Sequence, residues 1–115
     1  MLEILGASRD DQRRGCVENG AVRTFEITPE EMGLQRVKSE ALRGGEAKEN
    51  AQALVDVLKG KRGAFRDVAV LNAAAALVVA ARTKDLKRAL ALAQTSIDSG
   101  EAASRLQRLV AISNA

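Results

Sequence analysis

The chain has 115 residues, of which 46% are apolar and 29% charged, and its net charge is +3. These proportions exclude wholesale disorder and favour one domain with a single modest core. Only 2% of the residues are aromatic, which favours closely packed helices of Ala, Leu and Val over a β-sandwich. The mild basic bias tolerates phosphate or acidic ligands, but the scattered Lys and Arg residues argue against a dedicated nucleic-acid protein.

Cysteine and metal chemistry are restricted because the chain has one cysteine, Cys16, and no histidine. One cysteine excludes an internal disulfide, and the usual zinc sites need several Cys or His ligands. Without a histidine as its base, Cys16 is interpreted as a small apolar residue of a strand rather than a nucleophile. No secretory signal or membrane anchor is visible, so a cytoplasmic location is expected.

Residues 1–15 are predicted to be the residual end of a helix and a polar loop. Leu2, Ile4 and Leu5 followed by Gly6 are typical of a last helical turn and its stop. Residues 8–15 are charged and show no periodicity.

Asp10 and Asp11 form a carboxylate pair in this loop. Two adjacent acids can contact one Mg²⁺, which prefers hard oxygen ligands. The favoured alternative is a solvated loop, in which Arg13 and Arg14 neutralise the two acids.

Residues 16–27 are predicted to form a β-hairpin. Asn19-Gly20 suits the two positive-φ positions of a type I′ turn, and short runs rich in β-formers flank it, containing Val17, Val22, Phe25 and Ile27. A lone two-stranded hairpin is marginal, so it needs a larger sheet or a helical layer to lie against.

Residues 28–115 are predicted to be helical, beginning with two short turns. Thr28 is expected to cap the first, with Pro29 at the first helical position, Glu31 closing a capping box and Gly33 ending the turn. Ser39 is expected to cap the second, which Gly44 and Gly45 close.

The remaining pattern predicts helices over residues 46–60, about 65–82, 84–100 with Thr83 as the cap, and 101–113, all amphipathic except the second. The expected apolar faces are Ala47, Ala51, Leu54, Val55 and Leu58 in the first, Leu86, Ala89, Leu90, Ala93 and Ile97 in the third, and Leu106, Leu109 and Val110 in the last.

Two stretches are candidates for binding phosphate. Residues 42–50, "LRGGEAKEN", place two glycines before a helix, where free N–H groups can cradle an anion, although a simple turn is favoured. Lys59, Lys61, Arg62 and Arg66 form a basic cluster between two helices. A phosphate clamp is one interpretation, and a solvated turn that complements the helix dipole is the favoured one.

Residues 67–80, "DVAVLNAAAALVVA", are too short to cross a bilayer, which takes about twenty residues. A helix that is apolar on all sides is expected to be buried. Asn72 must then find hydrogen-bond partners, and local sequence does not say whether these are backbone or ligand.

Several stretches together resemble anthranilate phosphoribosyltransferase: "FEITPEEMGL", "ALRGGEAKENAQALVDVLKGKRGAFRDVAVLNAAAALVVA" and "ALAQTSIDSGEAASRLQRLV", in one order over residues 17–112. The resemblance implies the C-terminal third of the large α/β domain shared with pyrimidine nucleoside phosphorylases. As an isolated chain, an α+β fold is expected, a single partial domain that is mostly helical with one hairpin. In this family Asn72 is expected to serve structure, not catalysis.

The resemblance also implies a glycosyltransferase of tryptophan biosynthesis, which transfers phosphoribosyl from phosphoribosyl pyrophosphate to anthranilate with Mg²⁺. The family's Gly-Thr-Gly-Gly-Asp loop, phosphate site and anthranilate-contacting Arg do not occur here. "GASRDDQRRG" stands in the place of its Gly-Leu-Asp-Glu metal motif, where Asp10 could correspond to the motif's Asp but Asp11 stands where a Glu is expected. We therefore assign no catalytic, cofactor-binding or metal residue, and expect no tight Mg²⁺ binding by this chain alone.

Two kinds of function remain open: an enzyme fragment, inactive alone, that needs the N-terminal part to bind phosphoribosyl pyrophosphate and anthranilate, or a non-catalytic module that binds nucleic acid or a partner chain. Nucleic acid is disfavoured because no aromatic residues interleave with the basic ones. Apolar surface left uncovered is expected to promote self-association.

Overall fold

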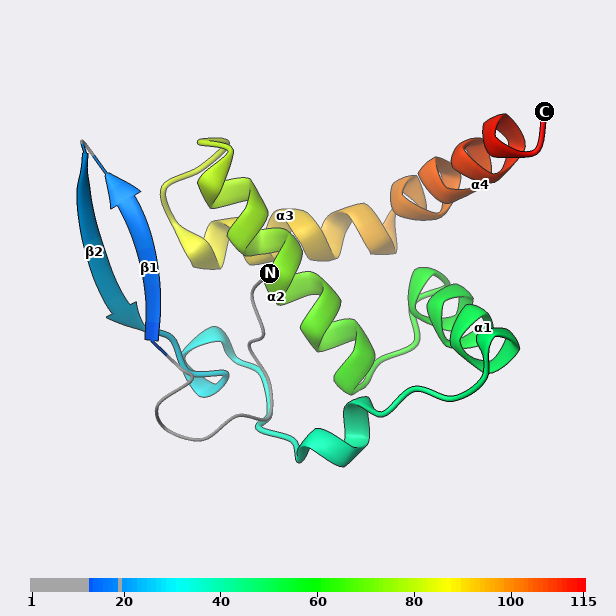
Figure 1. Ribbon diagram of the computed structural model, residues 1–115, viewed down its shortest axis with the longest axis horizontal. Coiled ribbons are helices and arrows are strands. Elements are labelled where there is room, and N and C mark those ends of the chain that lie inside the picture. The colour runs from blue at the N-terminus through cyan, green and yellow to red at the C-terminus, as the bar shows by residue number, and fades with distance from the viewer. Residues whose placement is uncertain (1–12, 19) are drawn as a thin grey trace.

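The computed structural model describes residues 13–18 and 20–115. The expected helix end at residues 2–6, the pair Asp10 and Asp11, and Asn19 therefore lie outside the described residues. A two-stranded sheet stands beside a group of helices, and the last helix leads away from the others toward the C-terminus (Figure 1). The elements are β1 (Arg13–Glu18), β2 (Ala21–Glu26), the 3₁₀ turns η2 (Glu30–Met32) and η3 (Ser39–Leu42), and the helices α1 (Ala47–Leu58), α2 (Ala64–Val79), α3 (Leu86–Asp98) and α4 (Glu101–Ser113).

β1 and β2 pair in antiparallel fashion, with Val17 opposite Val22 and Glu18 opposite Ala21. This register leaves two residues for the connection, and Gly20 has a φ of 77°, as the expected turn requires. β1 contains Cys16, as predicted, but it begins at Arg13, inside the stretch expected to be a loop. Main-chain pairing with β2 explains the difference, because it satisfies backbone groups whatever the polarity of the side chains.

The capping box at the first turn is confirmed. The Thr28 N–H donates to Glu31 Oε2 at 3.2 Å, and the Glu31 N–H donates to Thr28 Oγ1 at 3.4 Å. Pro29 directly precedes η2, and Gly33 follows it with a φ of 72°, ending the turn as predicted. At the second turn the predicted cap is wrong, because η3 begins at Ser39 itself and Lys38 takes the cap position without a side-chain hydrogen bond.

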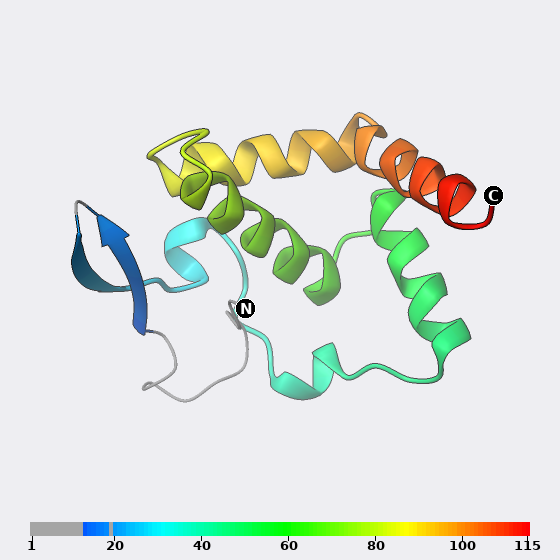
Figure 2. The same ribbon diagram turned by 45° about the horizontal axis from the view of Figure 1, so that its top comes forward.

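The core lies between α2 and α3, which cross at the centre of the molecule (Figures 1 and 2). Leu71, Ala74 and Ala89 are completely buried there. The predicted apolar face of the third helix is confirmed, since Ala89, Leu90, Ala93 and Ile97 are all buried. Val57 is the one residue of α1 that joins this buried cluster.

The apolar stripes predicted for the first and last helices are only partly covered: Val55 and Leu58 of α1 and Leu106 of α4 are half-buried. Ala47, Ala51 and Leu54 of α1 are exposed. Leu109 and Val110 of α4 are exposed by 63% and 50%. α2 is also not buried on all sides, because Val79 is 80% exposed. The apolar stripes lie where the sequence predicts them, but the described part of the chain covers only some of their residues.

The cap of α3 also differs from the sequence prediction. Asp85 Oδ1 accepts from the Lys87 N–H at 2.9 Å, so Asp85 caps the helix. Thr83 Oγ1 instead accepts from the Asp85 N–H at 3.2 Å, in the turn that precedes α3. Both residues suit caps, and the choice between them depends on where the chain turns after α2.

α2 ends in a left-handed residue that is not glycine. Ala81 has a φ of 55°, the only positive φ among the non-glycine residues described. The Arg82 N–H donates to the Leu77 carbonyl at 3.0 Å and the Ala81 N–H to the Val78 carbonyl at 3.0 Å. This is the Schellman pattern, in which the left-handed position normally carries glycine.

Ala81→Gly is expected to stabilise the protein by about 0.5–1 kcal/mol, because glycine avoids the left-handed penalty of Ala but loses more entropy on folding. Urea unfolding followed by circular dichroism measures the change. Ala80→Gly is the control: Ala80 has a φ of −76° and gains nothing. Equal stabilisation by both variants would contradict the assignment.

No helix in the described part of the chain is both long and apolar enough to cross a membrane.

Candidate functional site

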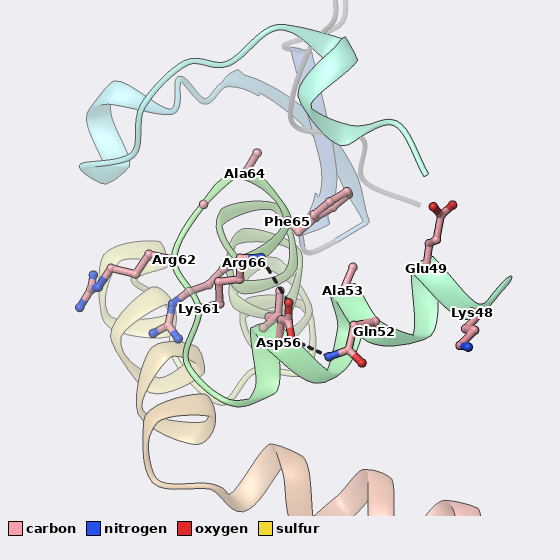
Figure 3. A pocket seen from close by; sticks show the side chains of 12 residues that line it. Lys48, Glu49, Gln52, Ala53, Asp56, Lys61, Arg62, Ala64, Phe65 and Arg66 are labelled. Carbon is pink, nitrogen blue, oxygen red and sulfur yellow. Dashed lines mark hydrogen bonds and ion pairs between the residues drawn. The ribbon is translucent and has the colours of Figure 1, made fainter. Parts of the chain in front are cut away.

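A groove of about 640 Å³ lies between α1 and the first turn of α2 (Figure 3). Four basic side chains, Lys48, Lys61, Arg62 and Arg66, line it together with the acids Glu49 and Asp56. The wall between them is apolar and includes Ala53, Val57 and Phe65.

The loop at one end of the groove is set by two glycines. Gly60 has a φ of 98°, and its neighbour Lys61 donates its N–H to the Asp56 carbonyl at 2.9 Å, which terminates α1. Gly63, with a φ of 139°, precedes α2 and offers no side chain to cap it. The first N–H groups of α2 therefore carry the positive end of the helix dipole without a side-chain acceptor from the cap residue.

Asp56 organises one side of the groove. Its Oδ1 accepts from Gln52 Nε2 at 2.8 Å and its Oδ2 accepts from Lys61 Nζ at 3.2 Å (Figure 3). The hydrogen bonds from Gln52 and then from Lys61 lower the pKa of the Asp56 carboxyl. Lys61 is thus paired with a carboxylate and 70% exposed, as expected of a solvated basic turn.

Gln52→Leu is expected to raise the pKa of Asp56 toward its ordinary value, and by more than Lys61→Met, because the Gln52 hydrogen bond is the larger cause of the lowering. A depressed carboxyl pKa stabilises the fold above the pKa of the unfolded chain, and this contribution is lost as pH falls through the folded pKa. An NMR titration of the Asp56 carboxyl carbon measures both shifts. Identical titrations in the wild type and Gln52→Leu would contradict the assigned contact.

Arg66 differs from the exposed cations of the groove because it is only 4% exposed. Its Nη2 donates to Asp98 Oδ1 at 2.8 Å, which joins the first turn of α2 to the end of α3. Nη1 is buried without a partner among the described residues. The interpretation of the basic cluster as a solvated turn is therefore wrong for Arg66.

The phosphate clamp, the less favoured interpretation of the basic cluster, is not assembled among the described residues. Asp56 and Asp98 pair with Lys61 and Arg66 respectively, and Arg62 is exposed. Asp98 is the partner that sequence reasoning missed, because the two residues are 32 positions apart. The only sequence signal was that "RD" and "IDSG" both belong to the family resemblance.

Asp67, next to Arg66 in the first turn of α2, shows the cost of partial burial. Desolvation raises the pKa of its carboxyl, and the nearby charges of Arg66 and Arg62 oppose this shift without overcoming it.

The Gly-rich stretch at residues 42–50 forms a turn that leads into α1. The Gly45 N–H donates to Asn50 Oδ1 at 2.9 Å, and Asn50 Nδ2 returns a bond to the Gly45 carbonyl at 2.9 Å. The Glu46 N–H donates to Glu49 Oε2 at 2.9 Å. A Cβ on Gly44 would lie 2.9 Å from Asn50 Oδ1. Side chains of α1 thus take up the N–H groups of Gly45 and Glu46 that the cradle interpretation needed, and the favoured interpretation of a turn is confirmed.

Asn72 has a backbone partner: its Nδ2 donates to the Val68 carbonyl, one turn earlier in α2, at 2.9 Å. This bond is structural, in line with the expectation for this residue.

A metal site does not form within the described residues, where no three His, Cys, Asp or Glu side chains gather. Asp10 and Asp11 lie outside them. The residues in view therefore do not supply an oxygen donor set for Mg²⁺, and no chemical step is derived through this ion.

The class of protein follows from a family model that spans the two-stranded sheet and the helices as far as the start of α4. The family model described as glycosyl transferase family, a/b domain, matches residues 11–103, and the chain belongs to that family.

Within the class, the chain is similar to anthranilate phosphoribosyltransferases. The chain is 55% identical over 99 residues to anthranilate phosphoribosyltransferase of Nitrobacter hamburgensis and 59% identical over 99 residues to that of Rhodopseudomonas palustris. Each match covers 86% of this chain and 29% of the relative.

The crystal structure of anthranilate phosphoribosyltransferase from Thermus thermophilus superposes with a TM-score of 0.80 at 39% identity, over 97% of this chain and 32% of that one. The chain thus spans less than a third of the length of these relatives and matches their C-terminal part. The resemblance inferred from the sequence is confirmed.

Proposed function

We propose that this chain forms the C-terminal part of an anthranilate phosphoribosyltransferase, an enzyme of tryptophan biosynthesis in the cytoplasm. The observation that carries the proposal is the 55–59% identity to enzymes of that name over 85–86% of the chain. In this role the whole chain is a single partial domain, and its hairpin adjoins the sheet of the complete α/β domain.

The part that this chain supplies is structural. Transfer of a phosphoribosyl group from pyrophosphate requires cations that stabilise the leaving charge and a pocket that aligns the amine of anthranilate. The cations Lys61 and Arg66 are already paired with Asp56 and Asp98. When bound in the complete enzyme, Mg²⁺ would supply charge stabilisation at pyrophosphate. In this proposal, substrate binding and catalysis require residues outside this chain.

The purified chain alone is expected to show no turnover with phosphoribosyl pyrophosphate, anthranilate and Mg²⁺. Turnover is expected when the chain is co-expressed with the remaining part of a relative in a host that lacks its own enzyme. Growth of that host without tryptophan is the sensitive readout. Turnover by the chain alone would refute the structural role, and absence of turnover despite a stable complex would refute the assigned activity.

A further inference from the structure

We propose that one continuous apolar surface on α1 and α2 binds the part of the enzyme that this chain does not span; the identity of this partner rests on the proposed function. The surface comprises the outer face of α2, made of Phe65, Ala69, Ala73, Ala76 and Val79, and the adjoining side of α1 around Leu54.

The outer face of α2 lies opposite its buried face. With 3.6 residues per turn, Phe65, Ala69 and Ala76 project on one side of the helix, and the buried residues Val70 and Ala74 project on the other. All five residues of the outer face are exposed, Phe65 by 42% and Val79 by 80%. A helix that is apolar on both sides normally packs on both sides, and among the described residues only the side toward α3 is covered.

The face continues onto α1 without a charged residue. A second groove, of about 240 Å³, lies between the helices and is lined by Ala53, Leu54 and Val57 of α1 and by Phe65 and Ala69 of α2. Asn50 and Asn72 are the polar residues at this surface, and both amides already donate to backbone carbonyls, at Gly45 and Val68. Small alanines on α2 permit a partner backbone to approach closely, so the surface fits an apolar sheet or helix face rather than a charged ligand.

The dimensions of the chain indicate how much surface is uncovered. Its accessible surface is 8664 Å², whereas a closed monomer of its mass exposes about 6,100 Å². The radius of gyration is 15.3 Å, against about 13.4 Å for a compact domain of this length. The excess, about 2,500 Å² spread over the whole chain, would correspond to about 5,000 Å² counted on both partners, which is within the range of obligate interfaces.

The similarity to the Thermus thermophilus enzyme indicates what the partner is. This chain keeps the fold of the Thermus thermophilus enzyme over 97% of its own length, yet covers only 32% of that enzyme. About two thirds of the enzyme therefore has to attach to a segment of this shape. The uncovered apolar surface of α1 and α2 offers area of the required kind, in addition to the exposed residues Leu109, Val110 and Ile112 of α4.

The test is co-expression of the tagged chain with the Rhodopseudomonas palustris enzyme from which the 99 matching residues have been deleted. Three versions of the chain are compared: the wild type, Ala73→Glu on the outer face of α2, and Ala91→Glu on the exposed side of α3. Both substitutions add one carboxylate at an exposed alanine of a helix, so their intrinsic effects on helix stability match. Circular dichroism of each purified chain establishes that its helices are intact.

We expect the wild type and Ala91→Glu to co-purify with the complement as an equimolar complex, and Ala73→Glu to bind at least about tenfold more weakly, because an unpaired charge is costly in an apolar interface. Ala69→Glu, also on the outer face of α2, is expected to weaken binding to the same degree. This result would show that the loss does not depend on position 73 alone. No complex with the wild type, or equal binding by Ala73→Glu and Ala91→Glu, would overturn the proposed surface.

The binding and activity readouts separate the two proposals. A complex that forms through this surface but lacks phosphoribosyltransferase activity leaves the surface standing and refutes the function. If instead the chain alone forms dimers in sedimentation, and Ala73→Glu abolishes them without any binding to the complement, the partner is a second copy and the proposed partner is wrong.

Discussion

Leu71→Ala is expected to lower the free energy of unfolding by about 3 kcal/mol, within the range of roughly 2–5 measured for buried leucines. Leu71 is completely buried between α2 and α3. Truncation removes the transfer free energy of the side chain and leaves a cavity that the neighbouring alanines cannot fill. Because the chain has no Trp or Tyr, urea unfolding followed by far-UV circular dichroism is the suitable measurement.

Leu92→Ala is the matched control for Leu71→Ala. Leu92 lies on α3 and is 48% exposed, so the same substitution is expected to cost less than about 1 kcal/mol. Equal losses in the two variants would mean that the core is not centred on the contact between α2 and α3.

Asp98→Ala is expected to destabilise the protein by about 2 kcal/mol, and Arg66→Met by less than about 1 kcal/mol, because the two partners are unequally buried. Arg66 is 5% exposed at its side chain and Asp98 is 56% exposed. Removing Asp98 leaves a buried guanidinium without its carboxylate, whereas removing Arg66 leaves a carboxylate that water can solvate. Methionine also replaces the buried stem of the arginine with apolar volume.

The double variant Arg66→Met with Asp98→Ala is expected to resemble Arg66→Met, since the cost of Asp98→Ala depends on the buried arginine. Glu30→Gln provides the control for loss of one carboxylate from an ion pair, because the contact of Arg36 with Glu30 is exposed on both sides. This control should leave the urea midpoint unchanged. A larger loss for Arg66→Met than for Asp98→Ala would reverse the proposed roles of the two residues.

The helical elements could be predicted closely because their signals are local. The last helix, expected over residues 101–113, is α4 at Glu101–Ser113, and the capping box of Thr28 and Glu31 is present. Capping, periodicity and glycine stops act within one or two turns, so short stretches contain the information for them.

Burial could not be predicted equally well, because it depends on elements distant in the chain. Leu54, Leu109 and Val110 occupy apolar stripes that the sequence shows correctly, yet all three are exposed. An apolar stripe indicates that a helix needs a partner, but it does not say whether the same chain provides one.

In the candidate site too, local features could be predicted and contacts between distant residues could not. The sequence brought Lys61, Arg62 and Arg66 together as a basic cluster, but it could not place Asp98 against Arg66 across 32 residues. That ion pair and the bond from Lys61 to Asp56 neutralise two of the four cations that line the groove.

By itself, the sequence determined the family, the order of the helices and the character of "DVAVLNAAAALVVA" as an apolar helix. Only the tertiary structure decided which side of that helix is covered: Leu71 and Ala74 face α3, and Ala73 and Ala76 face outward. The physical reason is that local sequence sets backbone conformation, whereas covering an apolar face requires a second surface. The described part of this chain provides that surface on one side of α2 alone.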